Sequence, residues 1–203
     1  MEHSWDTHYQ YFDQKKYPPS ATLLNALKLL KNERTIQQDK KFAIDLGCGN
    51  GIDTFALLQD QWKVLAIDQQ NESLQRIKEN TPVIYKEQLQ LDLNSFENIT
   101  TLPNSQLINA SFSLPFCHPN YFEKIWHIIT LSIIQKGFFS GHFFGINDSW
   151  SSKPEMTFHT LQQVKELLSD FKIIHHKEIE KKGKTISGKE KYWHVFHVVA
   201  QKK

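Results

Sequence analysis

The chain has 203 residues, which fits one domain, because single domains typically contain about 100–200 residues. Apolar residues make up 39% of the sequence and aromatic residues 12%, so a sizeable core can form and a wholly disordered chain is excluded. Lys and Arg number 24 against 22 Asp and Glu, a balance that is too even for a dedicated nucleic-acid-binding protein.

An aromatic arm and a helix, within residues 1–35, are expected ahead of the first strand. Trp5, Tyr9 and Tyr11 lie in the arm, where their rings would either pack on the core or form a lid. The helix is expected to begin after Ser20, because serine favours the capping position before a helix.

Strand-like and helical segments alternate through residues 40–203, which is typical of a parallel sheet covered by helices on both faces. The predicted strands are Phe42–Leu46, Lys63–Asp68, a strand ending at Leu89–Leu91, Gln106–Phe112 and Phe138–Ile146. The predicted helices are Asp53–Gln59, Asn71–Glu79 with an Asn cap, Tyr121–Gln135 ended by Gly137, and Thr160–Ser169 capped by Thr157 or Thr160. Two further strand-like segments joined by a Gly-containing loop predict an antiparallel hairpin, Phe171–Glu180 and Lys191–Gln201. We therefore expect residues 1–203 to form a single α/β domain.

The two cysteines, Cys48 and Cys117, exclude a disulfide framework and a four-cysteine zinc site. His194 and His197 would point to opposite faces of a strand, so we expect no shared metal ion there and no metal in the protein. The first ten residues lack the order of charged and apolar residues that marks a signal peptide. The most apolar helical stretch, residues 125–134, falls short of the ~20 residues of a membrane span. These features predict a cytoplasmic protein that does not bind a membrane.

A glycine-rich turn, Asp45-Leu46-Gly47-Cys48-Gly49-Asn50-Gly51, follows the first predicted strand. Its glycines permit a sharp turn and a close approach of a ligand to the backbone. The third glycine comes one residue earlier than in the G-x-G-x-x-G fingerprint of dinucleotide-binding proteins. The carboxylate of Asp45 would repel a pyrophosphate but suits a ligand that carries an ammonium group. The turn therefore favours an amino-acid-like nucleoside over NAD.

Two more acidic residues come at the ends of predicted strands. Asp68 closes the second strand, where a carboxylate can accept hydrogen bonds from both hydroxyls of a ribose. Asp92 leaves the third strand, placed to bond an adenine amino group while Leu93 lies against the ring. The fourth strand, with Asn109 and Ala110 near its end, is expected to face the same crevice.

Together these motifs resemble those of the class I S-adenosylmethionine-dependent methyltransferases. The glycine-rich turn is similar to their first motif, Asp68 to their ribose-binding acid and Asp92 to their adenine-side acid. Later segments, including 113–116 and 141–150, resemble small bacterial methyltransferases of the tellurite-resistance or thiopurine type. The resemblance implies a Rossmann-like fold with helices on both faces of a seven-stranded, mostly parallel sheet in the order 3-2-1-4-5-7-6. That order agrees with an antiparallel hairpin at the end of the chain.

The resemblance also implies that S-adenosylmethionine is the cofactor and S-adenosylhomocysteine the product. Its expected binding residues are Asp45, Gly47, Cys48, Gly49, Gly51, Asp68, Gln69, Asp92, Leu93, Asn109 and Ala110. The expected substrate pocket consists of Trp5, Tyr9, Tyr11, Ser113, Phe116 and Trp150. Aromatic rings that face the cofactor would favour its positive sulfonium, and Trp150 is one candidate for this contact.

The expected activity is transfer of a methyl group to a small-molecule acceptor by in-line displacement. Such a reaction depends mainly on positioning and on the exclusion of water. An amine or hydroxyl acceptor would need a base within hydrogen-bond reach, whereas a soft anion such as a thiolate would not. Asp148, His142 and His159 are the candidate bases, although a structural role is the simpler expectation for each.

Two alternatives stay open from the sequence. Residues 113–116, Ser-Leu-Pro-Phe, are similar to the motif by which adenine and glutamine N-methyltransferases hold a planar nitrogen, with imperfect matches at Ser113 and Leu114. The acceptor would then be a nucleic acid or a protein. The chain could also bind the cofactor without transferring its methyl group, as a sensor or partner subunit. The oligomeric state is not predicted.

Overall fold

A computed structural model describes residues 17–32, 41–185 and 187–203. The strands are β1 Phe42–Leu46, β2 Lys63–Asp68, β3 Leu89–Leu93, β4 Ser105–Ala110, β5 Ile133–Gly145, β6 Phe158–His159, β7 Phe171–Lys184 and β8 Glu190–Lys202. They form one sheet in the order β3-β2-β1-β4-β5-β8-β7, and β6 pairs with the end of β5. Without the two-residue β6, this is the predicted order 3-2-1-4-5-7-6. The fold prediction is therefore confirmed.

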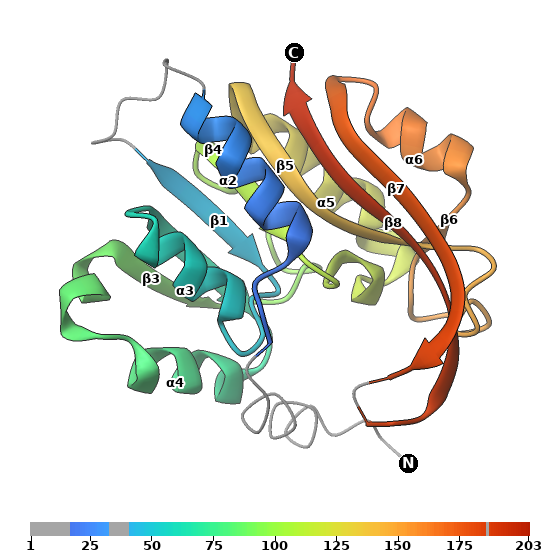
Figure 1. The fold of residues 1–203 in the computed structure, drawn as a ribbon, viewed down its shortest axis with the longest axis horizontal. Helices are drawn as coiled ribbons and strands as arrows, with labels where there is room; N and C mark the ends of the chain where they lie inside the picture. Colours follow the sequence, from blue (N-terminus) through green and yellow to red (C-terminus); the bar gives the residue numbers. More distant parts are fainter. Residues whose placement is uncertain (1–16, 33–40, 186) are drawn as a thin grey trace.

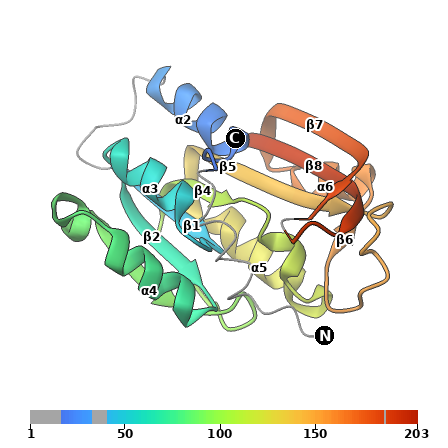
Figure 2. The same ribbon diagram turned by 60° about the horizontal axis from the view of Figure 1, so that its bottom comes forward.

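Parallel pairing runs from β3 through β5, and only the last two strand pairs are antiparallel. The strands β7 and β8 form the predicted hairpin. Next to the connecting loop, β7 continues to Lys184 instead of Glu180, and β8 begins at Glu190 instead of Lys191. Figure 2 shows this hairpin on one side of the molecule and α4 on the other. The carboxyl ends of the parallel strands consequently meet at one edge of the sheet.

Helices cover both faces of the sheet (Figure 1). They are α2 Ala21–Asn32, α3 Ile52–Gln59, α4 Asn71–Asn80, α5 Pro119–Ser132 and α6 Leu161–Leu167, with 3-10 turns η2 Val83–Gln88 and η3 Leu114–Phe116. Alternate residues of β1 enter different cores, because successive side chains of a strand point to opposite faces. Ala43 packs with α2, α3 and α4, whereas Ile44 and Leu46 pack with α5 and α6. No helix in the described ranges is long and apolar enough to cross a membrane.

Two predicted helix boundaries are wrong. Helix α5 ends at Ser132, and Gly137 lies inside β5 instead of ending the helix. The isoleucines after Ser132 fit a helical period as well as a strand, so the sequence pattern could not separate the two elements. Asn71 was expected to cap helix α4, but it is the first residue of the helix. The capping position is Gln70, whose side chain makes no hydrogen bond to the helix backbone.

The start of α6 is confirmed at Thr160. Its hydroxyl accepts the Gln163 backbone N–H at 3.2 Å, and the Gln163 side chain accepts the Thr160 N–H at 2.8 Å. This reciprocal pair is a capping box, which satisfies two backbone donors that the helix itself leaves unpaired. Helix α2 likewise starts after Ser20, whose carbonyl accepts the Leu24 N–H, but the Ser20 hydroxyl bonds Thr22 instead of a backbone N–H.

Candidate functional site

The turn between β1 and α3 requires glycine for two separate reasons. Gly47 and Gly51 have φ of +68° and +80°, in the left-handed region that side chains disfavour. A Cβ at Gly47 would lie 2.3 Å from the Cβ of Ser113, and one at Gly51 would lie 2.6 Å from a carbon of Ile77. The turn therefore brings the N-terminus of α3 and the segment after β4 close to the end of β1.

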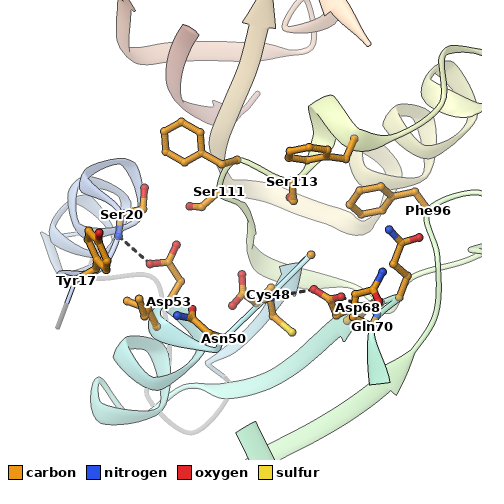
Figure 3. A pocket seen from close by; sticks show the side chains of 18 of the residues that line it. Tyr17, Ser20, Cys48, Asn50, Asp53, Asp68, Gln70, Phe96, Ser111 and Ser113 are labelled. Carbon is orange, nitrogen blue, oxygen red and sulfur yellow. Dashed lines mark hydrogen bonds between the residues drawn. The ribbon is translucent and has the colours of Figure 1, made fainter. Parts of the chain in front are cut away.

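A buried hydrogen-bond network lies beneath this turn and is centred on Asp45. The carboxylate accepts from the Thr54 hydroxyl at 2.6 Å and from the Asn109 amide nitrogen at 2.9 Å. The same nitrogen donates to Asp53 at 3.0 Å, and Asp53 also accepts the Ser20 backbone N–H at 2.8 Å (Figure 3). Burial, with the nearby charge of Asp53, raises the pKa of Asp45 to about 7.

Asp68 ends β2 beside the same turn. Its two carboxylate oxygens accept the backbone N–H groups of Gly49 and Gln70, each at 2.8 Å. Burial raises the pKa of Asp68, and these two backbone donors oppose that shift. The carboxylate is thus fixed at the end of β2 and is drawn beside Cys48 in Figure 3.

A cavity of about 470 Å³ opens along the carboxyl ends of the strands. Three carboxylates line it, from Asp45, Asp53 and Asp68, whereas no Lys, Arg or His belongs to its lining as far as the structure describes the chain. We define the aromatic wall as the four contacting rings of Phe116, Phe144, Trp150 and Trp193, which also line the cavity. In the sheet, β4 separates the strands that carry the carboxylates from β5 and β8, which carry Phe144 and Trp193.

Most of the predicted cofactor-binding residues meet at this cavity. Those that line it are Asp45, Gly47, Cys48, Gly49, Asp68 and Gln69, together with Ser113, Phe116 and Trp150 of the expected substrate pocket. Gly51 shapes the turn, and the fully buried Asn109 orients Asp45 and Asp53, so neither lines the cavity. Three more of the predicted residues, Ala110, Asp92 and Leu93, do not line the cavity either. The contact of Asp92 and Leu93 with adenine stays a prediction. Trp5, Tyr9 and Tyr11 lie outside the described residues.

None of the three candidate bases lines the cavity. Asp148 forms a buried ion pair with Lys191. The Nδ1 atom of His142 accepts the Phe112 N–H at 3.2 Å, and its Nε2 bonds His197 at 3.0 Å. Burial lowers the pKa of His159 to about 4. Asp148 and His142 thus have partners in the interior, and the choice between a structural and a catalytic role stays a prediction for all three residues.

Several lining residues were not identified from the sequence. Asp53 lies in the first turn of α3, where a carboxylate is favoured, so the position of the glycine-rich turn could have indicated it. Phe112 comes directly after β4 and has φ of +53°. Thr185 and Ser187, at the tip of the β7–β8 hairpin, carry no local signal because only the long hairpin brings them to the cavity.

One group of side chains in the described part of the chain has the composition of a metal site, namely Glu178, Glu180 and His194. The Nδ1 atom of His194 accepts the Asn147 backbone N–H at 3.1 Å. The other ring nitrogen, Nε2, therefore carries the hydrogen, which it donates to Glu178 at 2.9 Å. A nitrogen in that state is not a metal ligand, so we interpret the group as a hydrogen-bond network on the hairpin.

The sequence model of the methyltransferase domain family matches residues 37–194, most of the chain. The chain belongs to this methyltransferase family. A search of curated protein sequences finds no match. The chain has the fold of the class I S-adenosylmethionine-dependent methyltransferases, as the motifs implied, and its structure resembles that of TehB.

Solved structures of methyltransferases share this fold at low sequence identity. TehB from Haemophilus influenzae is 16% identical with a TM-score of 0.76, over 95% of this chain and 66% of TehB. The 1,6-didemethyltoxoflavin-N1-methyltransferase of Burkholderia thailandensis, bound to 1,6-didemethyltoxoflavin and S-adenosylhomocysteine, is 16% identical with a TM-score of 0.62, over 98% and 86%. The N-methyltransferase NodS from Bradyrhizobium japonicum WM9, in complex with S-adenosylhomocysteine, is 10% identical with a TM-score of 0.65, over 89% and 85%. Of these three structures, TehB is matched over the smallest share of its own length, 66%.

Proposed function

We propose that this methyltransferase binds S-adenosylmethionine in the cavity and transfers its methyl group to a small-molecule acceptor, releasing S-adenosylhomocysteine. The observation that carries the proposal is the charge of the cavity, whose described lining has three carboxylates and no cationic side chain. A ligand with a sulfonium and an ammonium group matches that charge, whereas the pyrophosphate of NAD does not. The volume of about 470 Å³ lies within the usual range of ligand pockets.

The residues at the carboxylate side fit this cofactor. Asp68, fixed by two backbone N–H groups, would accept from the ribose hydroxyls, and the backbone of the glycine-rich turn would lie against the amino-acid portion. Asp45 and Asp53 supply negative charge for the ammonium group. When bound, the cofactor supplies an electrophilic methyl group on a positive sulfur. The residues of the chain then hold the acceptor in line and exclude water.

The lining chemistry favours an acceptor that is nucleophilic without help from a protein base. The titratable side chains among the described lining residues are Tyr17, Cys48 and the three aspartates. Burial, with the charges of Asp45 and Asp68, holds the pKa of the Cys48 thiol well above its usual range, and Asp68 is engaged by two backbone donors. A thiolate, or a neutral nitrogen of a heterocycle, meets this condition.

The contacts of residues 113–116 hold their polar groups in the protein framework. The Ser113 hydroxyl donates to the Leu46 carbonyl at 2.6 Å, and the Pro115 carbonyl accepts the Thr157 N–H at 2.9 Å. Both oxygens keep a lone pair for a further donor. The aromatic wall is the feature that favours a small acceptor with an apolar, planar body, and the Burkholderia structure names a small-molecule ligand, 1,6-didemethyltoxoflavin.

Calorimetric titration with S-adenosylmethionine, S-adenosylhomocysteine and NAD tests the cofactor. We expect micromolar binding of the first two and none of NAD. Replacing Asp68 by Ala should weaken binding by about 1–3 kcal/mol, because charge-assisted hydrogen bonds to the ribose are lost. The exposed Glu79 on α4, replaced by Ala, is the matched control and should bind as the wild type does.

Unchanged affinity in the Asp68→Ala variant would contradict the role of this residue. Release of S-adenosylhomocysteine in the presence of acceptors separates an enzyme from a protein that only binds the cofactor. A cytoplasmic location belongs to the same proposal, and cell fractionation tests it.

A further inference from the structure

A buried ammonium group lies against the rings of the aromatic wall. Lys191, on β8, has a fully buried side chain and forms an ion pair with Asp148, whose side chain is equally buried. Asp148 also accepts the backbone N–H groups of Trp150, at 3.0 Å, and His194, at 3.1 Å. The ion pair is therefore tied to the loop after β5 and to β8, the two segments that supply the indoles of the wall.

Three rings of the wall surround the ammonium. The Nζ atom of Lys191 lies 3.9 Å from the ring centre of Trp150, 4.5 Å from that of Trp193 and 5.3 Å from that of Phe144. These rings line the cavity, whereas Lys191 does not. The ammonium therefore lies against these three rings and outside the lining of the cavity.

A cation that already lies against an aromatic ring changes what else the ring binds. The face of an aromatic ring carries partial negative charge, which attracts cations. An ammonium at close range draws that density toward itself, so the rest of the ring becomes less negative. Such a ring stacks better with an electron-rich or anionic planar group and worse with a second cation.

The arrangement also changes the expectation for Trp150. Its ring was expected to favour the positive sulfonium of the cofactor. Lys191 already makes a cation–π contact with this ring, and Lys153 lies over the same ring at 5.0 Å. The ring therefore suits the acceptor side of the reaction.

We propose that Lys191 and Asp148 are specificity-determining residues, which make the aromatic wall select planar acceptors that are electron-rich or anionic over cationic ones. The inference rests on the proposed function. Lys191 acts through Trp150, Trp193 and Phe144 and does not touch the acceptor, so it is a positioning residue. Asp148 compensates the buried charge and keeps the ammonium in place against the rings.

The test uses a neutral replacement of the whole pair. Lys191→Met alone would leave the Asp148 carboxylate buried and unpaired, which destabilises proteins strongly. The double variant Lys191→Met/Asp148→Asn keeps the volume of both side chains and removes both charges. The matched control is Lys202→Met, because Lys202 lies over the ring of Phe171 at 5.1 Å and neither residue lines the cavity. Thermal unfolding and titration with S-adenosylhomocysteine establish that each variant is folded.

Three thiol acceptors of similar size provide the comparison: thiophenolate, thiophenolate with a trimethylammonium group on the ring, and cyclohexanethiolate. Production of S-adenosylhomocysteine gives kcat and KM for each. In parallel, tryptophan fluorescence of the protein saturated with S-adenosylhomocysteine gives the dissociation constant of each thiol without turnover.

We expect the wild type to prefer thiophenolate to its cationic analogue. In the double variant, KM and the dissociation constant for thiophenolate should rise about 3- to 30-fold, a factor typical of cation–π effects. The values of kcat and of KM for S-adenosylmethionine should stay the same, and the preference over the cationic analogue should shrink. The Lys202→Met control should match the wild type in all of these values.

Equal changes for all three thiols, or no change, would overturn the inference, since a merely structural role predicts one of these results. If S-adenosylmethionine does not bind the wild type, the proposed function itself fails. If the cofactor binds and the thiols bind without a preference set by charge, only the inference fails.

Discussion

Asp45 shows how a single residue links the charge of the site to pH. Its carboxylate is almost completely buried, and the amide nitrogen of Asn109 uses its two hydrogens to bond Asp45 and Asp53 at once. Burial disfavours the charged form of Asp45, and the nearby charge of Asp53 adds to this effect, so the pKa of Asp45 rises to about 7. A positive ligand beside them would favour the ionised form.

We predict that the affinity for S-adenosylmethionine rises with pH between about 6 and 8. Below a pKa of about 7, Asp45 is protonated in the free protein, and binding of a cation releases that proton. The free protein then binds more protons than the complex, so affinity increases with pH through the pKa of about 7 and levels off above about pH 8. Calorimetry in buffers of different ionisation enthalpy measures the proton release. Asp45→Asn should abolish it, and a wild type that releases no proton near pH 6.5 would refute the assignment.

At the scale of elements, the β1–α3 turn and the β7–β8 hairpin approach the cavity from different strands. The turn is fixed by close packing, because Gly47 lies against Ser113 and the Ser113 hydroxyl bonds the Leu46 carbonyl. The tip of the hairpin is open by comparison. Gly188 has φ of +83°, and beyond its chain neighbours no heavy atom of the described residues lies within 4 Å of a Cβ there.

These two glycines give a matched pair of substitutions. Gly188→Ala should cost only the strain of a left-handed backbone, about 1–2 kcal/mol. Gly47→Ala should cost about 1–3 kcal/mol more, because the new methyl group would also displace Ser113. Denaturant unfolding measures both, and cofactor titration should show weaker binding only for Gly47→Ala. Equal losses of stability would show that packing at the turn contributes nothing.

For the whole molecule, ligand binding is expected to stabilise the fold, because the cavity receives residues from many elements. Its described lining extends from Tyr17, before α2, through β1 and β2 to Trp193 on β8. A ligand in it would therefore contact parts of the chain that are far apart in the sequence. Such a ligand binds the folded chain and not the unfolded one.

S-adenosylhomocysteine at about 100 times its dissociation constant should stabilise the protein by about 2.7 kcal/mol. For a chain of this size the corresponding rise in Tm is roughly 5–10 °C. Differential scanning calorimetry measures it, and NAD at the same concentration should have no effect. A protein whose Tm is the same with and without saturating S-adenosylhomocysteine would not bind it in this cavity.

The sequence by itself indicated the fold class and the positions of Asp45 and Asp68, and the strand order came from the resemblance to the class I methyltransferases. Local signals sufficed for the former, because glycines at the turn, acidic residues at strand ends and alternating apolar segments each depend on nearby residues. Boundaries such as the end of α5 were wrong, since the isoleucines beyond Ser132 fit both a helix and a strand. The capping box at Thr160 was predictable because it lies within four residues.

Only the tertiary structure decided which side chains face the cavity. Asp148 and His142 were candidate bases from the sequence. In the structure both side chains are buried, where Asp148 pairs with Lys191 and His142 bonds His197. The aromatic wall consists of rings from η3, β5, β8 and the loop after β5, and Lys191 on β8 contacts three of these rings. Such contacts form between strands that are neighbours in the sheet and distant in the sequence. Which residues make these contacts depends on strand pairing and burial, and a local sequence pattern does not determine either.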